Sequence, residues 1–275
     1  RVFLGGNIGV PLSSFVLNTS ENDLIVLELS SFQLETVDSF RPHIAALLNI
    51  EPDHFDRYSN FSDYLGAKMN IFKNQQSSDW AVVNKSLSAC GIPRRMKAAV
   101  VEFSKEFPDE NFSCVYKIAS ILGLKKHDCL EVFSSFRGLS HRLQFVRNIE
   151  GVAFINDSKA TNPSSTVWAL KNTGGPIILL AGGKDKGLDY SVIVPYLKKV
   201  KKINLFGEAA EKIKKTLTGY ADIEIFTSLK ELVDASLHQA SGGDKILFSP
   251  MCSSYDMFSD YKHRGNSFMG LVKKL

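Results

Sequence analysis

Long apolar runs are the first feature that this sequence lacks. No hydrophobic segment approaches the ~20 residues that a membrane-spanning helix needs, and the amino end has no signal-peptide pattern. Cysteine is also scarce, and the four cysteines lie apart, without a CxxC pair or a nearby histidine pattern: Cys90, Cys114, Cys129 and Cys252. These absences speak against membrane insertion, disulfides and thiolate metal sites, so we expect a cytoplasmic protein.

A large excess of one charge is missing as well. The 275 residues include 33 basic and 29 acidic side chains, a net charge of +4 that is too small to indicate a nucleic-acid partner. The basic cluster Lys198, Lys199, Lys201 and Lys202 is expected at the end of a helix, where cations face the negative end of the dipole and solvent. Hydrophobic residues make up 44% of the chain, which is ordinary for a globular protein of one large or two moderate domains.

Short apolar runs of strand length alternate with helical patterns along the chain. In the first half we expect strands at 24–29, 44–50, 81–83 and 98–103, with helices at 62–72 and 113–124. In the second half each expected strand is followed by a helical pattern, and these strands lie at 152–155, 177–180, 203–206, 223–226 and 246–248. This alternation predicts an α/β fold whose second half is a Rossmann-like, mostly parallel sheet wrapped by helices.

The periodicity breaks at Phe136–Arg142, and we place a domain boundary there, with domains at 1–138 and 139–275. The sequence opens at Arg1 without methionine and runs directly into the strand-like Val2–Leu4. It therefore looks like a fragment that begins inside a domain.

Two strands of the first half run into residues that can bind a metal. The strand at 24–27 ends in Glu28, and the strand at 44–50 is followed by Glu51, Asp53 and His54. Parallel strands would bring both ends to one edge, so Glu28 and His54 could converge on a hard cation such as Mg²⁺. The alternative is that Glu28 caps the following helix and that His54 is a surface loop residue.

Lys68 stands out in the helix that follows. Phe61, Tyr64, Leu65 and Phe72 recur at helical spacing, and Lys68 falls on the same apolar face. An ammonium group there must extend to solvent, pair with an anion or be chemically altered, because burying it unpaired is costly. The residues alone favour extension to solvent.

Three polar loops follow strands in the second half. Asn156–Pro163 offers backbone N–H groups, a lysine and hydroxyls to an anion at a helix start, Ala181–Gly187 is rich in glycine and lysine, and Ser249–Asp256 adds hydroxyls. No Walker A motif is present, because Asp185 follows Gly183-Lys184 and Ile178 stands where the first glycine should be. The residues alone indicate an α/β enzyme that binds a cation and an anionic ligand between two domains.

Several ordered motifs resemble one family. Gly5–Gly9, Glu28–Leu34, Asn49–Tyr58, Asn156–Asn162 and Ser249–Asp256, with Arg264-Gly265-Asn266 beyond them, are similar to the Mur ligases from one end of the chain to the other. The form Asp-Ser-Lys-Ala-Thr-Asn resembles the members that add D-glutamate. Folylpolyglutamate synthases share the architecture but fit these motifs less well.

The resemblance implies a truncated P-loop-type Mur ligase central domain that binds ATP and Mg²⁺, and a Rossmann-like C-terminal domain that binds the amino acid. Its expected activity is ATP-dependent amide formation in peptidoglycan synthesis, by a monomer. ATP phosphorylates the carboxylate of UDP-N-acetylmuramoyl-L-alanine, and the amine of D-glutamate attacks the acyl phosphate.

The resemblance also implies residue roles. Glu28 and His54 would bind Mg²⁺, and Lys68 would be carbamylated by CO₂, which replaces the expectation that it extends to solvent; the three form the catalytic set. The other expected contacts are grouped by ligand: Asn111, Arg142 and Asp157 for ATP; Lys159, Thr161, Lys186, Ser254 and Tyr261 for D-glutamate; Asn7, Ser30, Gln33 and His54 for the muramoyl-alanine substrate. Asn111 reads equally well as a helix N-cap.

The sequence departs from the family pattern in three places. The amino-terminal nucleotide-sugar domain and the phosphate loop are absent, the stretch from Phe103 to Asn111 is short, and Lys184-Asp185-Lys186 replaces the commoner aspartate-glycine-lysine order. We therefore expect no turnover from this chain as written. A sister Mur-type or folylpolyglutamate-type ligase and a non-catalytic binding remnant stay open as alternatives.

Overall fold

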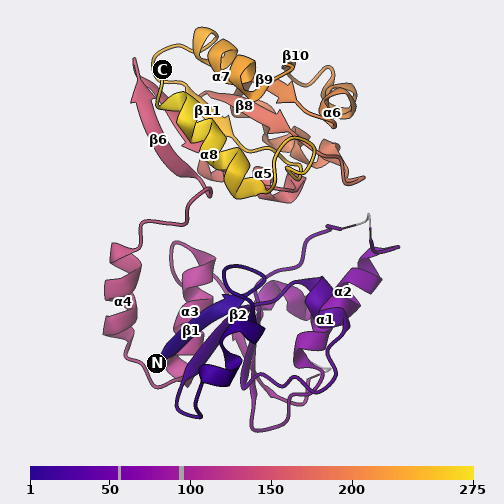
Figure 1. The fold of residues 1–275 in the computed structure, drawn as a ribbon, viewed down its shortest axis with the longest axis vertical. Helices are drawn as coiled ribbons and strands as arrows, with labels where there is room; N and C mark the ends of the chain where they lie inside the picture. The colour runs from indigo at the N-terminus through magenta and orange to yellow at the C-terminus, as the bar shows by residue number, and fades with distance from the viewer. Residues whose placement is uncertain (55–56, 93–95) are drawn as a thin grey trace. The chain divides into compact units, whose positions relative to one another are not determined.

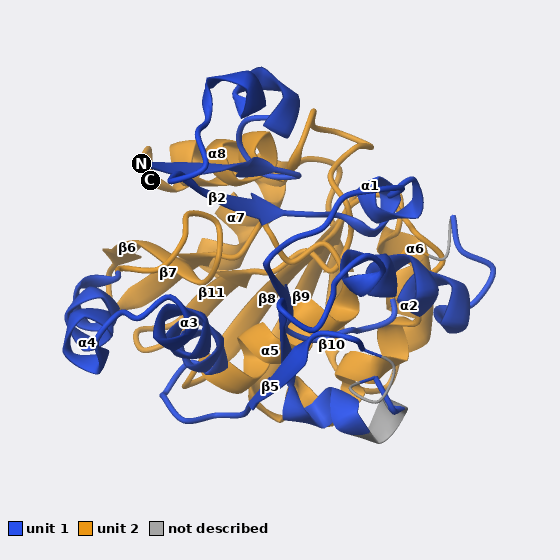
Figure 2. Cartoon of the chain, turned by 90° about the horizontal axis from the view of Figure 1, so that it is seen from below, with its two compact units in different colours: residues 1–52, 57–136 blue, residues 53–56, 137–275 orange. Residues whose placement is uncertain are grey.

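Contacts within the chain divide the protein into two compact units (Figure 2). The computed structural model describes residues 1–54, 57–92 and 96–275. Unit 1 comprises Arg1–Pro52 and Arg57–Phe136, and unit 2 comprises Asp53–Asp56 and Arg137–Leu275. Residues 55–56 of the Asn49–Tyr58 motif and the side chain of Cys90 lie outside the described part. None of the helices in the described part is both long and apolar enough to cross a membrane.

Unit 1 contains two separate parallel sheets. β1 (Val2–Gly6) pairs with β2 (Leu24–Glu28), and a second sheet has the order β3 (Ile44–Leu47), β4 (Trp80–Asn84), β5 (Ala99–Phe103). All four strands predicted in this half are therefore present, although β3 is shorter than expected. The prediction that β2 and β3 end at one sheet edge is wrong, because β2 takes its backbone hydrogen bonds from β1.

Helices cover both faces of the three-stranded sheet. α2 (Phe61–Met69) continues into the 3₁₀ turn η3 (Asn70–Phe72), as predicted, and packs its apolar residues with Ala45, Leu47, Ala81 and Val83. α3 (Glu110–Ile121) packs with Val82 and Phe103 on the opposite face. α4 (Lys126–Ser135), α1 (Ser31–Glu35) and the 3₁₀ turns η1 (Leu12–Ser14), η2 (Val16–Asn18) and η4 (Lys85–Cys90) complete the unit.

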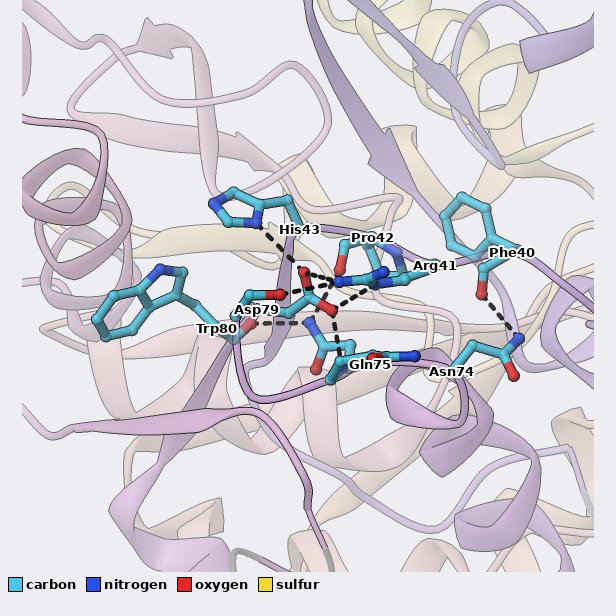
Figure 3. Close-up of polar contacts among 10 residues, drawn as sticks. Phe40, Arg41, Pro42, His43, Asn74, Gln75, Asp79 and Trp80 are labelled. Atoms are coloured by element: carbon cyan, nitrogen blue, oxygen red, sulfur yellow. Dashed lines mark hydrogen bonds and ion pairs between the residues drawn. The ribbon is translucent and has the colours of Figure 1, made fainter.

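A buried carboxylate ties together the segments that enter β3 and β4 (Figure 3). Arg41 donates from Nε and Nη2 to the two oxygens of Asp79, at 2.7 and 3.2 Å, and His43 Nδ1 lies 3.3 Å away. The hydrogen bond from Arg41 is the main reason that the pKa of Asp79 falls to about 2. This cluster lies at the amino ends of the strands, so its role is structural.

Unit 2 is built on one six-stranded sheet (Figure 1). Its order is β10 (Asp222–Ile225), β9 (Val200–Phe206), β8 (Ile177–Gly182), β11 (Lys245–Phe248), β7 (Val152–Asn156) and β6 (Gln144–Ile149). Every pairing is parallel except that of β6 with β7. The Rossmann-like prediction is confirmed; β6 was not predicted, because Arg147 and Asn148 interrupt its apolar residues and leave no apolar run.

Two hydrophobic layers sandwich this sheet. One face packs against α5 (Pro163–Asn172), the 3₁₀ helix η6 (Tyr190–Lys199) and α6 (Ala210–Leu217). The other face packs against α7 (Leu229–His238) and α8 (Tyr261–Val272). All six residues of β8 are buried, as expected for a central parallel strand covered on both sides.

The basic cluster differs from its prediction in part. Lys198 and Lys199 do end a helix, but η6 is a 3₁₀ helix with Pro195 inside it. Lys201 and Lys202 instead lie in β9 and form ion pairs, the first with Asp244 and the second with Asp222 and Glu224. Placing all four at a helix end was therefore wrong.

Candidate functional site

The candidate site of unit 2 lies at the carboxyl ends of three neighbouring strands. β7, β11 and β8 are adjacent in the sheet, so the loops that follow them, 157–162, 249–256 and 183–187, lie at one edge. Ligands bind at this edge in open parallel sheets. These loops hold most of the residues predicted to bind D-glutamate.

The loop after β7 starts helix α5 as predicted. Asn162 is the N-cap, its side chain accepting from Ser165 N, and Pro163 is the first helical residue. The free Nδ2 of Asn162 donates to Asp53 Oδ2 at 2.8 Å. The helix start therefore presents a donor to a carboxylate.

The loop after β8 supplies a cation to the same carboxylate. Lys186 Nζ lies 2.5 Å from Asp53 Oδ1, and both side chains are largely buried. Burial alone would raise the pKa of Asp53, but the charge and hydrogen bond of Lys186 outweigh it and hold the pKa below its usual value. Lys186 and Asn162 together thus form a small carboxylate-binding arrangement within unit 2.

The loop after β11 contributes buried hydroxyl groups. Ser249 donates to Asp157 Oδ2 at 2.8 Å, and Leu143 N donates to Oδ1 at 3.1 Å. Asp157 is only 4% exposed, and this burial raises its pKa to about 6 despite the two hydrogen bonds. Both oxygens of this carboxylate already accept hydrogen bonds within the protein, so the predicted contact of Asp157 with ATP would be an additional one.

The remaining predicted D-glutamate residues lie around these loops. Lys159 Nζ lies 5.8 Å from the ring centre of Tyr261, which is the first residue of α8. Ser254 is buried and Thr161 partly buried, in the loops after β11 and β7. Their contact with an amino acid stays a prediction.

Sequence reasoning missed several buried polar residues beneath these loops. Arg264 of α8 is fully buried and donates to Ser158, Cys252 and Ser253. His141 Nδ1 lies 2.9 Å from Asn156 Nδ2. The motif Arg264-Gly265-Asn266 was a signal for Arg264, but its burial could not be read from the sequence.

In unit 1 the structure brings Asn7 and Glu28 together. The parallel pairing of β1 and β2 places Gly6 opposite Glu28, and Asn7 Nδ2 lies 3.5 Å from Glu28 Oε1. The alternative that Glu28 caps α1 is wrong, because Ser30 is the N-cap and forms a capping box with Gln33. Glu28 is therefore an exposed carboxylate at a strand end and remains available to a cation.

The three predicted metal ligands divide between the units. Glu28 and Lys68 belong to unit 1 and His54 to unit 2, so their convergence stays a prediction. Lys68 Nζ lies 5.6 Å from the ring centre of Tyr64, on the predicted face of α2. Across the described ranges, no group of three or more His, Cys, Asp and Glu residues is arranged to hold a metal ion; a carbamylated lysine would add a ligand of another type.

Two further predicted ATP residues are exposed. Asn111 lies in the first turn of α3, but Asp109 is the N-cap and accepts from Asn111 N, so the N-cap alternative for Asn111 is wrong. Arg142 is exposed in the segment before β6. The positive charge of Arg142 does act on Asp157, where it lowers the pKa against the effect of burial.

The two units define a class: α/β proteins that have a central sheet unit and a Rossmann-like unit with polar loops at its strand ends. A model of the Mur ligase middle domain matches residues 4–145, and a model of the Mur ligase glutamate ligase domain matches residues 141–252. The chain belongs to the Mur ligase family.

Similar proteins agree with this assignment. UDP-N-acetylmuramoylalanine–D-glutamate ligases from Caldanaerobacter subterraneus and Geotalea uraniireducens are 37% and 38% identical over 100% of this chain and 70% and 69% of their own. Among solved structures, the MurF ligase from Thermotoga maritima in complex with ADP has a TM-score of 0.76 at 15% identity, covering 99% of this chain and 74% of that one. E. coli FolC in complex with DHPP and ADP has a TM-score of 0.68 at 17% identity, covering 92% and 67%. These structural likenesses establish the fold.

Proposed function

We propose that this protein is an ATP-dependent amide ligase that joins D-glutamate to UDP-N-acetylmuramoyl-L-alanine in peptidoglycan synthesis. The observation that carries the proposal is the sequence identity of 34–38% to the D-glutamate ligases named above and their relatives, over nearly the whole chain. The carboxylate-binding arrangement of unit 2 supports it independently, because an amino-acid donor must be held by its carboxylates.

The donor side of the reaction falls to unit 2. Lys186 now binds a carboxylate of Asp53 at 2.5 Å, and we propose that it binds a carboxylate of D-glutamate during turnover. Thr161 and Ser254 would add hydroxyl donors, while Lys159 and Tyr261 would line the site. A charge-assisted hydrogen bond from a largely buried lysine gives affinity and orients the amine for attack.

The activation step needs cations around the transferred phosphoryl group. We propose that Glu28, His54 and a carbamylated Lys68 hold Mg²⁺, a hard ion for which the carboxylate and carbamate oxygens are suitable ligands. The ion would supply charge neutralisation at the phosphoryl oxygens. Arg142 would bind ATP phosphate, Asp157 the ribose and Asn111 the adenine. Asn7, Ser30 and Gln33, with His54, would contact the muramoyl-alanine substrate.

The chemical sequence conserves atoms and charge. An oxygen of the substrate carboxylate attacks the γ-phosphorus of ATP, and ADP leaves. The neutral amine of D-glutamate then attacks the carbonyl carbon, and the tetrahedral intermediate expels phosphate as the amide forms; the nitrogen loses one proton and keeps the other as the amide N–H. Donors that hold the oxyanion of that intermediate lower the barrier most.

The test is phosphate release by the protein as its gene encodes it, with ATP, Mg²⁺ and UDP-N-acetylmuramoyl-L-alanine, across a panel of amino acids. We expect release with D-glutamate and none with L-glutamate or without an amino acid. Release with a different amino acid would overturn the donor assignment but keep the ligase. No release with any donor, from a folded protein, would refute the ligase.

The same proposal includes a monomer that works in the cytoplasm. Because the sequence has no Walker A motif, we also propose that residues 1–275 alone do not turn over. Sedimentation of the protein with substrates bound tests the monomer, and phosphate release by the isolated chain would contradict the second statement.

A further inference from the structure

Arg264 is one of the large, fully buried side chains in the described part of the chain, and no step of the proposed reaction uses it. Nε donates to Ser158 Oγ at 3.0 Å and Nη2 to Ser158 O at 2.8 Å. Nη1 donates to Cys252 O at 2.9 Å and to Ser253 O at 3.1 Å. Within the part of the chain that the structure describes, all its hydrogen-bond acceptors are therefore neutral.

A buried guanidinium whose hydrogen-bond acceptors are all neutral is costly, even with the negative charge of Asp256 acting on it, so its position calls for a reason. Burial lowers the pKa of Arg264 to about 10, and the group still carries its charge at neutral pH. A well-packed apolar residue would stabilise the fold at least as well. What the guanidinium adds is a rigid, planar set of donors that fixes several carbonyl groups at once.

The acceptors of Arg264 lie in two loops of the candidate site. Ser158 belongs to the loop after β7, three residues before Thr161, and Cys252 and Ser253 precede Ser254 in the loop after β11. Since the peptide group is planar and trans, holding the carbonyl of Ser253 also fixes the direction of the N–H of Ser254. One guanidinium therefore sets the relative placement of both loops.

The third loop is attached to the same point. Lys184 N donates to Ser253 O at 3.0 Å, so the carbonyl held by Arg264 also holds the loop after β8. Gly183 has a φ of +136°, and a Cβ at this position would lie 3.0 Å from Arg264 Nη1 and 2.3 Å from Ser253 O. The close approach of this loop to Arg264 requires glycine.

α8 is fastened to these loops at its first turn. Ser158 Oγ, which accepts from Arg264, donates to Tyr261 O at 2.9 Å. A Cβ on Gly265 would lie 2.3 Å from His141 Nδ1, so the helix also passes close to the segment before β6. Tyr261 thus enters the site from an element that Arg264 anchors.

We propose that Arg264 is the positioning residue of the amino-acid donor site: it holds the loops after β7, β8 and β11 in one arrangement, so that Thr161, Lys186 and Ser254 meet the donor together. This inference rests on the proposed function, because it assumes that these loops bind an amino acid. Under this inference Arg264 raises the affinity for the donor without contacting it, because it holds the residues that do.

The kinetic test compares Arg264→Lys and Arg264→Met in the protein as its gene encodes it. An ammonium group keeps the charge but cannot reproduce the fork geometry, so we expect both variants to raise KM for D-glutamate about tenfold or more, with KM for ATP changed less than twofold. Lys274→Met, at an exposed lysine two residues beyond the end of the same helix, is the matched control and should behave as wild type. Equal rises in both KM values, or none, would overturn the proposal.

Ser158→Ala provides a milder variant that keeps the guanidinium in place. It removes one acceptor of Arg264 and the donor to Tyr261 O, and we expect KM for D-glutamate to rise several-fold while the protein remains folded. An unchanged KM in Ser158→Ala, together with a general loss of kcat in the Arg264 variants, would show a role in stability alone and would contradict positioning.

Amide hydrogen exchange separates this inference from the proposed function. In the Arg264 variants we expect faster exchange in residues 157–162, 182–187 and 250–256, with β8 and β9 protected as in wild type. Uniformly faster exchange throughout unit 2 would overturn the positioning role. If wild type fails to join D-glutamate, the proposed function falls, and the exchange result still decides whether Arg264 holds the loops.

Discussion

Asp79 of unit 1 and Asp157 of unit 2 are both buried carboxylates, yet their surroundings differ in one respect. Asp79 is paired with Arg41, which is the main cause of its pKa of about 2. Asp157 accepts hydrogen bonds from Ser249 and Leu143, both neutral, and burial raises its pKa to about 6. The pairing with Arg41 stabilises the negative charge of Asp79, whereas burial destabilises the negative charge of Asp157.

The positions of the two aspartates explain this difference. Asp79 lies before β4, away from the strand ends that bind ligands, where only stability is at stake. Asp157 follows β7 at the edge that carries the candidate donor loops, and strained or costly groups collect at functional sites. Arg264 follows the same rule as Asp157, since it is a buried charge whose hydrogen-bond partners at the same edge are neutral.

The units also differ in how they bury strands of similar sequence. β8 is buried at every residue, whereas Leu24, Ile25 and Val26 of β2 are 38–45% exposed. Their apolar composition alone does not distinguish the two strands. Unit 2 thus presents its site on a fully packed sheet, and we expect its residues to control donor binding, while residues of unit 1 control turnover.

The largest effect should come from Lys68 in unit 1. Lys68→Ala removes the proposed carbamate, and we expect kcat to fall about 10²–10³-fold with partial recovery on adding a short carboxylic acid. Phosphate release at saturating substrates measures it, and Lys85→Ala, an exposed lysine of the same unit, is the control. A raised KM for D-glutamate with a normal kcat would instead assign donor binding to unit 1 and would contradict the proposed division of roles between the units.

A smaller, separable effect is expected at Lys186 in unit 2. Lys186→Met removes the cation that holds a carboxylate and should raise KM for D-glutamate about 10–100-fold, leaving KM for ATP unchanged. Initial rates at varied D-glutamate and at varied ATP give both constants. A fall in kcat with normal donor affinity would contradict the assignment of donor binding to this loop.

Asp79→Asn sharpens the structural half of the comparison. It breaks a buried, charge-assisted pair, so the free energy of unfolding of unit 1 should fall by roughly 1–3 kcal/mol at pH 7. Since the folded pKa is about 2 and the unfolded value about 3.9, this contribution is complete above about pH 4 and disappears as the pH falls toward 2. Amide hydrogen exchange in β4 measures this fall in stability, with β8 as the internal control. An equal loss of protection in both strands would contradict a role confined to unit 1.

Asp157→Asn should have the smallest effect and the opposite sign. The folded pKa of about 6 lies above the unfolded value, so the wild-type unit gains stability as the pH falls from about 6 to 4. The variant removes this dependence and should stabilise unit 2 by about 1–2 kcal/mol at pH 7, with no gain at pH 4. Exchange in β8 at both pH values measures the difference; destabilisation at pH 7 would show that the charge is stabilising in the folded state.

Periodicity was sufficient for most of the fold. The apolar runs predicted β2 to β5 of unit 1 and β7 to β11 of unit 2, and Asn162-Pro163 predicted the start of α5. It failed for β6, where Arg147 and Asn148 interrupt the apolar residues, and for strand order, since nothing local in the sequence indicates that β2 and β3 lie in different sheets. The lysines of β9 were misplaced because their ion-pair partners, Asp222, Glu224 and Asp244, are distant along the chain.

The candidate site divides in the same way. The placement of the loops that carry Lys186 and Thr161 at one edge of the sheet could be predicted, because both loops follow apolar strands. Arg264 and Asp53 could not, because their importance depends on burial and on partners more than 100 residues away along the chain. Motif reading thus located the loops of the candidate site and missed the buried residues that hold these loops.

One measurement tests the central claim most directly: the fate of ¹⁸O placed in the carboxylate of UDP-N-acetylmuramoyl-L-alanine, followed by mass spectrometry of the products. An acyl-phosphate ligase specific for D-glutamate predicts an amide product that forms with D- but not L-glutamate, and one ¹⁸O atom in each phosphate released. Phosphate without ¹⁸O, or an amide formed equally with L-glutamate, would contradict the account.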